Sequence, residues 1–177
     1  MMQPVTTSGA VAAGPTTQSL PPPVLEGRDP EPEERGRAAL ELIPYDWRTQ
    51  LPGWQIAFHA AIEGAYGYTL TDERRIDIFV RQDQPDTLLA HVIAHELGHA
   101  VDVSHNDDGD RQRWQEFRQV GTVPWWPNSR ASDFATGAGD FAECFAAWQV
   151  GEAHFRSKLG PLPSPAALAL LAELAAG

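Results

Sequence analysis

The chain has 177 residues, which is enough for one domain with a hydrophobic core of its own. It carries 13 Lys and Arg against 24 Asp and Glu, and the net charge of −11 disfavours nucleic acid and anionic membranes as partners. The single cysteine, Cys144, excludes an internal disulfide and any zinc site built on several cysteines.

The N-terminal stretch differs in composition from the rest of the chain. Residues 1–36 are rich in Pro, Thr, Ser and Gly and then in acidic residues, a composition that buries too little apolar surface to fold. We therefore predict a disordered tail or linker over 1–36 and one domain over 37–177. No leader or apolar run of about 20 residues is present, so we expect no membrane insertion. The cytoplasm is then the default compartment, or an extracytoplasmic one if the tail is a processed linker.

Strand patterns precede helix patterns along the domain. Segments 53–60, 66–70 and 75–81 alternate apolar and polar residues, which is typical of strands with one buried face, and 71–75 reads as a turn between the last two. Helical periodicity follows in 86–105, 110–120, 140–155 and 164–176. This order predicts an α+β domain: a small sheet packed on the helix 86–105, followed by a mainly helical C-terminal part.

The helix 86–105 contains the sequence His95-Glu96-Leu97-Gly98-His99, an H-E-x-x-H motif. Four residues advance a helix by slightly more than one turn, so His95 and His99 project from one face and can share one Zn²⁺ ion. Zinc lowers the pKa of a bound water, and Glu96 is placed to take its proton as general base. The motif therefore predicts zinc-dependent hydrolysis of peptide bonds.

The third zinc ligand has two candidates. His105 would complete the spacing of metzincins, but Asp102 stands where those enzymes normally turn the chain at a glycine, and no methionine follows Met2. Glu143 lies in an otherwise apolar helical segment, where a lone carboxylate would be costly to bury without a metal or a cation. We favour Glu143, with Asp140 either as a substitute ligand or as the N-cap of that helix.

These motifs resemble those of a known family. "HELGHAVD", followed about forty residues later by "SDFATGAGDFAE", is similar to the gluzincin zinc metallopeptidases related to the anthrax lethal-factor catalytic domain and the Pro-Pro endopeptidases. The resemblance implies a zincin-like fold, with zinc held by His95, His99 and Glu143 and with Glu96 as general base. The family usually places a tyrosine upstream of the glutamate to stabilise the oxyanion; here Phe134 stands near that place.

Three readings of function remain open from the sequence. The first is a zinc metalloendopeptidase with a peptide or protein substrate, which we expect to pair with an edge of the small sheet, such as the strand 75–81. The second is a metzincin-like protease that uses His105. The third is a non-catalytic zinc-binding or regulatory domain. His91 is interpreted as a core or supporting histidine, and Asp102 either as a solvated acid at the helix end or as an orienting partner for an imidazole.

Overall fold

The computed structural model describes residues 31–127 and 132–177. The tail prediction for residues 1–30 lies outside them, whereas 32–36, also assigned to the tail, form the start of a helix. The helices are α1 (Pro32–Leu40), α2 (Trp47–Gln50), α3 (Asp86–His105), α4 (Asp108–Arg118), α5 (Gly137–Val150) and α6 (Pro165–Leu174). The strands are β1 (Gln55–Ala60), β2 (Gly67–Leu70) and β3 (Arg75–Val80), and the short 3-10 turns are η1 (Thr71–Glu73), η2 (Asp133–Ala135) and η3 (Glu152–His154).

The three strands form one mixed sheet in the order β1-β3-β2. β3 is parallel to β1 and antiparallel to β2, so both of its edges are already hydrogen-bonded. The three predicted strands are confirmed, since each contains or nearly coincides with one observed strand. The expectation that a peptide pairs with the strand 75–81 is wrong, because β3 is central. Among the strands of residues 31–127 and 132–177, the edges of the sheet are formed by β1 and β2 instead.

The sheet buries one face and exposes the other. Ile76, Ile78 and Val80 of β3 are 0%, 0% and 5% exposed and belong to the core with α1 and α3. On the opposite face the rings of Phe79 and Tyr68 meet edge to face, with centroids 5.6 Å apart, and Tyr68 is 51% exposed. The alternation of apolar and polar residues in the sequence of β3 is therefore matched by an alternation of buried and partly exposed side chains.

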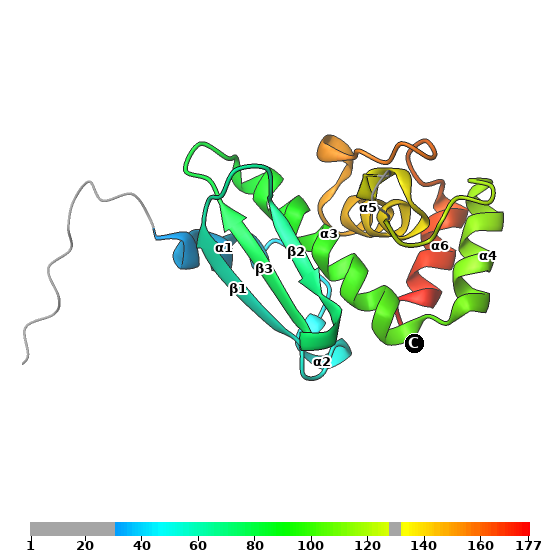
Figure 1. Cartoon of the computed structure of the whole chain (residues 1–177), viewed down its shortest axis with the longest axis horizontal. Coiled ribbons are helices and arrows are strands. Elements are labelled where there is room, and N and C mark those ends of the chain that lie inside the picture. Colours follow the sequence, from blue (N-terminus) through cyan, green and yellow to red (C-terminus); the bar gives the residue numbers. More distant parts are fainter. Residues whose placement is uncertain (1–30, 128–131) are drawn as a thin grey trace, which may run out of the picture.

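Helix α3 runs between the sheet and the C-terminal helices (Figure 1). Its contact with α5 is close at Gly98, where an added Cβ would lie 2.7 Å from the Cα of Ala142. Gly98 is thus required by the close approach of two helix backbones. This crossing places Glu143, the residue after Ala142, beside the His-Glu motif of α3.

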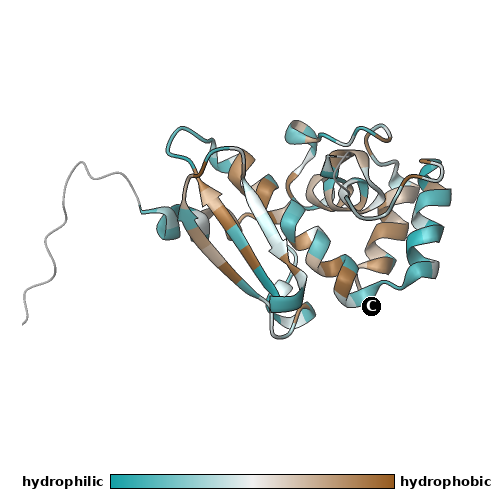
Figure 2. Ribbon diagram, in the orientation of Figure 1, coloured by the Kyte–Doolittle hydropathy of each residue, from teal (hydrophilic) through white to brown (hydrophobic). Residues whose placement is uncertain are grey.

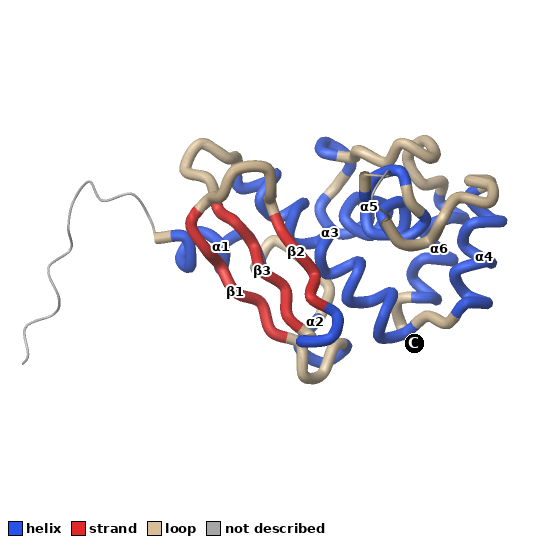
Figure 3. Tube along the Cα trace, in the orientation of Figure 1, coloured by secondary structure: helices blue, strands red, loops and turns tan. Residues whose placement is uncertain are grey.

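The three strands form one sheet that packs on α3, and the C-terminal part beyond α3 is mainly helical (Figure 3), which confirms the predicted α+β class. Apolar residues follow β3, α5 and α6, while α4 is hydrophilic along most of its surface (Figure 2). Among the described residues, no helix combines the length and the apolar character needed to cross a bilayer.

Candidate metal centre

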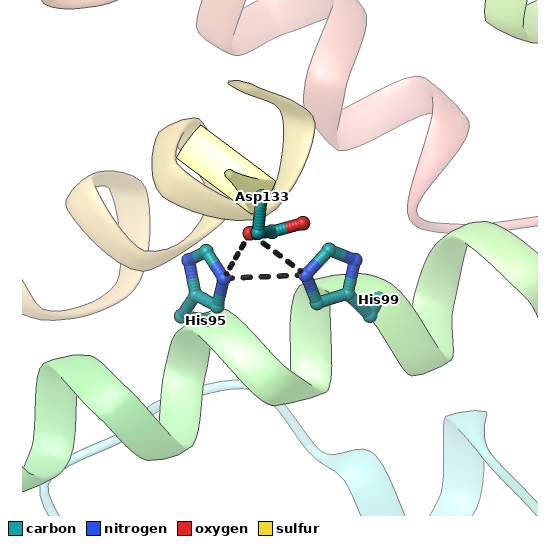
Figure 4. A group of neighbouring side chains, drawn as sticks. All are labelled: His95, His99 and Asp133. Carbon is teal, nitrogen blue, oxygen red and sulfur yellow. Dashed lines mark hydrogen bonds and ion pairs between the residues drawn. The ribbon is translucent and has the colours of Figure 1, made fainter. Parts of the chain in front are cut away.

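The two histidines of the motif direct their Nε2 atoms toward each other. His95 and His99 are one turn apart on α3, and their Nε2 atoms are 3.2 Å apart (Figure 4). Their rings meet nearly at right angles, with centroids 4.8 Å apart. This geometry confirms the part of the expectation that concerns the helix, namely that the four-residue spacing places both imidazoles on one face.

Asp133 supplies a carboxylate to the same place. Its Oδ2 lies 2.9 Å from Nε2 of His95 and 3.4 Å from Nε2 of His99 (Figure 4). The potential ligand atoms of His95, His99 and Asp133 all lie within 4.8 Å of one another. Two neutral imidazoles and one carboxylate are a donor set that zinc and similar divalent cations accept, so these residues can hold a metal ion.

The turn that carries Asp133 is anchored to the start of α5. Thr136 caps this helix by accepting a hydrogen bond from the Gly139 amide, and its hydroxyl donates to the main-chain oxygen of Asp133 at 2.7 Å. An added Cβ at Gly139 would lie 2.1 Å from that oxygen and 2.8 Å from Oδ2. A glycine at 139 is therefore needed for the Asp133 carboxylate to lie where it does.

Glu143 contacts His95 on its other ring nitrogen. The Glu143 side chain is buried, with Oε1 2.8 Å from Nδ1 of His95 and 3.3 Å from Nε2 of His91. Oε2 accepts a hydrogen bond from the Arg156 amide. Glu143 thus lies behind His95, in the position from which a carboxylate orients a metal-binding imidazole. Its assignment as a direct ligand stays a prediction.

The electrostatics of the cluster favour a positive charge at its centre. Burial alone would lower the pKa of His95, but hydrogen bonds with Asp133 and Glu143 and the nearby charge of Glu96 raise it to about 10. Burial acts in the opposite direction on the carboxyls. Hydrogen bonds with His95 and His99 nevertheless hold the pKa of Asp133 well below its usual range, and those with His91 and His95 lower the pKa of Glu143 to about 2. A metal cation would replace the charge that a proton on His95 supplies.

A cavity of about 510 Å³ opens over these residues. Glu96 lines it, largely buried, and so do the two motif histidines and Asp133. The edge of the sheet forms one wall through residues 64–69. The remaining lining combines five apolar side chains, Leu88, Val92, Trp126, Pro127 and Phe134, with the polar or charged side chains of Thr71, His91, Glu143 and Arg156. This is the setting expected of a substrate site, a largely apolar cleft with a few convergent polar groups.

Three other residues that the sequence analysis considered do not belong to the group formed by His95, His99 and Asp133. Nε2 of His105 is 3.0 Å from the main-chain oxygen of Gln50, at the far end of α3. Asp102 is fully buried and accepts hydrogen bonds from Trp125 and Arg111, so its interpretation as a solvated acid is wrong. His91 is buried and supports Glu143, as its interpretation as a core or supporting histidine proposed.

Asp140 is a buried structural acid in α5. It accepts hydrogen bonds from the side chains of Trp114, Arg118 and Ser157. The interpretation of Asp140 as N-cap is wrong, because α5 begins three residues earlier and Thr136 caps it.

Sequence reasoning missed Asp133. The residue lies in an irregular stretch with no fixed spacing to the H-E-x-x-H motif, so no pattern marked it as a ligand. The only local signal was the Thr136 cap and the glycines after it, which allow a carboxylate to fold back over the start of a helix.

Comparisons with protein-family models, with curated proteins and with solved structures find no match to this chain.

Proposed function

We propose that this chain is a zinc-dependent metallopeptidase. The observation that carries the proposal is the convergence of His95, His99 and Asp133 in one cleft, which Glu96 of the H-E-x-x-H motif also lines. Zinc, when bound, supplies a Lewis acid that makes water a stronger acid and polarises a carbonyl group. The identity of the metal rests on the donor set, because two imidazoles and one carboxylate with an open position are typical of catalytic zinc.

Glu96 is the proton carrier in this proposal. Its carboxylate takes a proton from the attacking water as the oxygen bonds to the scissile carbonyl carbon. When the carbon–nitrogen bond breaks, the same carboxyl group returns the proton to the leaving amine. One residue thus serves both steps, and the peptide bond plus water yields a carboxylate and an amine.

Strand β2 is the best support for a peptide substrate. It is an edge strand whose residues 67–69 line the cavity, so its free main-chain groups can pair with an extended peptide. A peptide paired with β2 would pass over Glu96 and over the candidate metal-binding group of His95, His99 and Asp133. Apolar side chains of the substrate find partners in Tyr66, Leu88 and Val92 of the cleft.

A peptide library with mass-spectrometric readout tests the peptidase proposal. Wild-type protein loaded with zinc is expected to cleave, the Glu96→Gln variant to lose cleavage while keeping zinc, and chelator-treated protein to recover on adding zinc. Equal cleavage by wild type and Glu96→Gln would mean a contaminating protease and would count against the proposal. So would absence of cleavage by wild type that has zinc bound.

A second candidate, a zinc-binding domain without turnover, is favoured by one observation. Phe134 lines the cleft with its ring 5.5 Å from the ring of His95, near the place where the resemblance to gluzincins calls for a tyrosine hydroxyl. A phenyl ring donates no hydrogen bond to an oxyanion. Tight zinc binding without cleavage of any library peptide would support this candidate over the peptidase.

A further inference from the structure

We propose that strand β2 holds the Glu96 carboxylate in its working position, with Thr69 as hydrogen-bond donor and Gly67 as the residue that leaves it room. The inference rests on the proposed function, because the position of Glu96 matters for hydrolysis only if it is the base. It deepens that proposal by assigning a positioning role to two residues that lie outside the H-E-x-x-H motif.

Thr69 reaches both ends of residue 96. Its hydroxyl oxygen lies 2.7 Å from Oε2 of Glu96 and 3.1 Å from the main-chain oxygen of the same residue. The shorter contact is a charge-assisted hydrogen bond from a hydroxyl to a carboxylate. The hydroxyl has one proton, so the Glu96 side chain is held by a hydrogen bond from the sheet while the longer contact with the backbone oxygen is the alternative acceptor.

Gly67 lies against the same side chain. An added Cβ at Gly67 would be 2.8 Å from both Cγ and Oε1 of Glu96, closer than carbon atoms of real side chains approach. The glycine is required for space. Any side chain at 67 would push Glu96 away from the strand or the strand away from α3.

The pairing of β2 explains why these two residues act together. Gly67 lies opposite Ile78 and Thr69 opposite Ile76 in the antiparallel register, and both isoleucines are fully buried. Residues two apart on a strand share a face, so Gly67 and Thr69 both face α3 while Tyr68 faces solvent. Gly67 and Thr69, which contact Glu96, thus belong to a strand whose partner, β3, is hydrogen-bonded on both edges.

One oxygen of Glu96 is held and the other is left for chemistry. Within the described part of the chain, no hydrogen bond to Oε1 of Glu96 is found, whereas Oε2 accepts from Thr69. A base needs one oxygen free to meet the proton of water, and a second contact that limits rotation of the carboxylate raises the fraction of time spent in the productive orientation.

Kinetics of three variants test the role. Thr69→Val removes the hydroxyl at nearly constant shape, and kcat is expected to fall by about 10- to 100-fold, the equivalent of one hydrogen bond to a charged group, with KM little changed. Thr69→Ser keeps the hydroxyl and is expected to restore most of kcat. Thr49→Val, which removes an exposed hydroxyl from α2, is the matched control and should leave both constants unchanged.

Binding of acetohydroxamic acid supplies a readout that needs no turnover. Calorimetric titration of zinc-loaded protein should show weaker binding for Thr69→Val and for Glu96→Gln, because the hydroxamate needs the carboxylate as acceptor. The double variant should bind no more weakly than Glu96→Gln alone, since Thr69 acts through Glu96. Gly67→Ala should weaken binding in the wild-type background by the same route.

These outcomes separate the two proposals. If wild type cleaves peptides but Thr69→Val matches it in kcat, the positioning role is overturned while the peptidase stands. If wild type binds zinc but cleaves nothing, the peptidase fails and the hydroxamate cycle still decides the role of Thr69. Equal losses from Thr69→Val in the wild-type and Glu96→Gln backgrounds overturn the positioning role in either case.

Discussion

At the scale of single residues, the main question is which carboxylate completes the metal centre. Asp133 lies at the Nε2 side of His95, where His99 also points, whereas Glu143 lies at the Nδ1 side. A metal ion bound between the two Nε2 atoms would therefore lie next to the Asp133 carboxylate, whereas Glu143 would lie on the opposite side of the His95 ring. The sequence favoured Glu143 because it is buried in an apolar helix, and its burial is observed, but histidines can satisfy a buried carboxylate as well as a metal can.

Competition with a chelating dye tests this assignment. Asp133→Ala is expected to weaken zinc binding by more than about 100-fold because a ligand is lost, and Glu143→Gln by about 10- to 100-fold because an orienting partner is weakened. Asp72→Ala, at an exposed acid of η1, should have no effect. The reverse order, with Asp133→Ala close to wild type and Glu143→Gln unable to bind zinc, would make Glu143 the ligand.

The shifted pKa values also predict how the stability of the metal-free protein depends on pH. The pKa of His95 is raised to about 10 from 6.5, so its contribution is complete below pH 6.5 and is lost as pH rises toward 10. The pKa of Glu143 is lowered to about 2 from 4.5, so its contribution is complete above pH 4.5 and is lost as pH falls toward 2. Urea unfolding should therefore show the highest stability between about pH 4.5 and 6.5.

The matching control is His95→Gln. Glutamine does not titrate, so the decline between pH 6.5 and 10 should flatten in this variant, and the acid-side decline should become smaller because only His91 then lowers the pKa of Glu143. An alkaline decline of the same size in His95→Gln and wild type would show that another group causes it.

At the scale of secondary-structure elements, the crossing of α3 and α5 is the contact most sensitive to a single methyl group. Gly98→Ala should lower the free energy of unfolding by about 1–3 kcal/mol, because the new Cβ meets the Ala142 backbone, which cannot turn aside as a side chain can. Gly109→Ala in α4 is the control: its Cβ meets only the exposed Asp107 side chain, so stability should stay the same or rise slightly. Chemical denaturation of both variants measures the difference, and equal stabilities would contradict the close approach.

The elements themselves could largely be predicted from the sequence, while the site could be predicted only in part. The alternation in 75–81 and the apolar stripe of 86–105 are local signals, and both elements are observed. The four-residue spacing of His95 and His99 is local too. Asp133 is brought to them by the docking of η2 and α5 on α3, a tertiary contact between segments more than thirty residues apart that leaves no periodic trace in the sequence.

The same limit explains the error about β3. Its strongly apolar alternation shows that it is buried on one face, but says nothing about its neighbours in the sheet. β1 pairs with β3 rather than with β2, its neighbour in sequence, and β2 lies at the edge of the sheet. This order is seen only in the folded chain.

At the scale of the whole molecule, metal binding should be coupled to folding, because the ligands come from separate parts of the chain. Zinc at about 100 times its dissociation constant is expected to add about 2.7 kcal/mol to stability, which corresponds to a rise in Tm of about 5–10 °C for a domain of this size. Differential scanning calorimetry with and without zinc measures it. The double variant His95→Ala/His99→Ala should show no rise, and a rise of similar size there would place the stabilising zinc elsewhere.

The place of Asp133 late in the chain has a consequence for synthesis. A ribosome completes β2 and its support for Glu96 early, then the two histidines of α3, and only about thirty residues later the carboxylate of η2. Because η2 is held by the start of α5, the metal-binding group is complete only after α5 has docked on α3. Under the proposed function, a growing chain would therefore carry Glu96, the base, before it can hold a metal ion firmly. Under the proposed function, the unfinished protein would be a poor hydrolase toward itself and toward its neighbours.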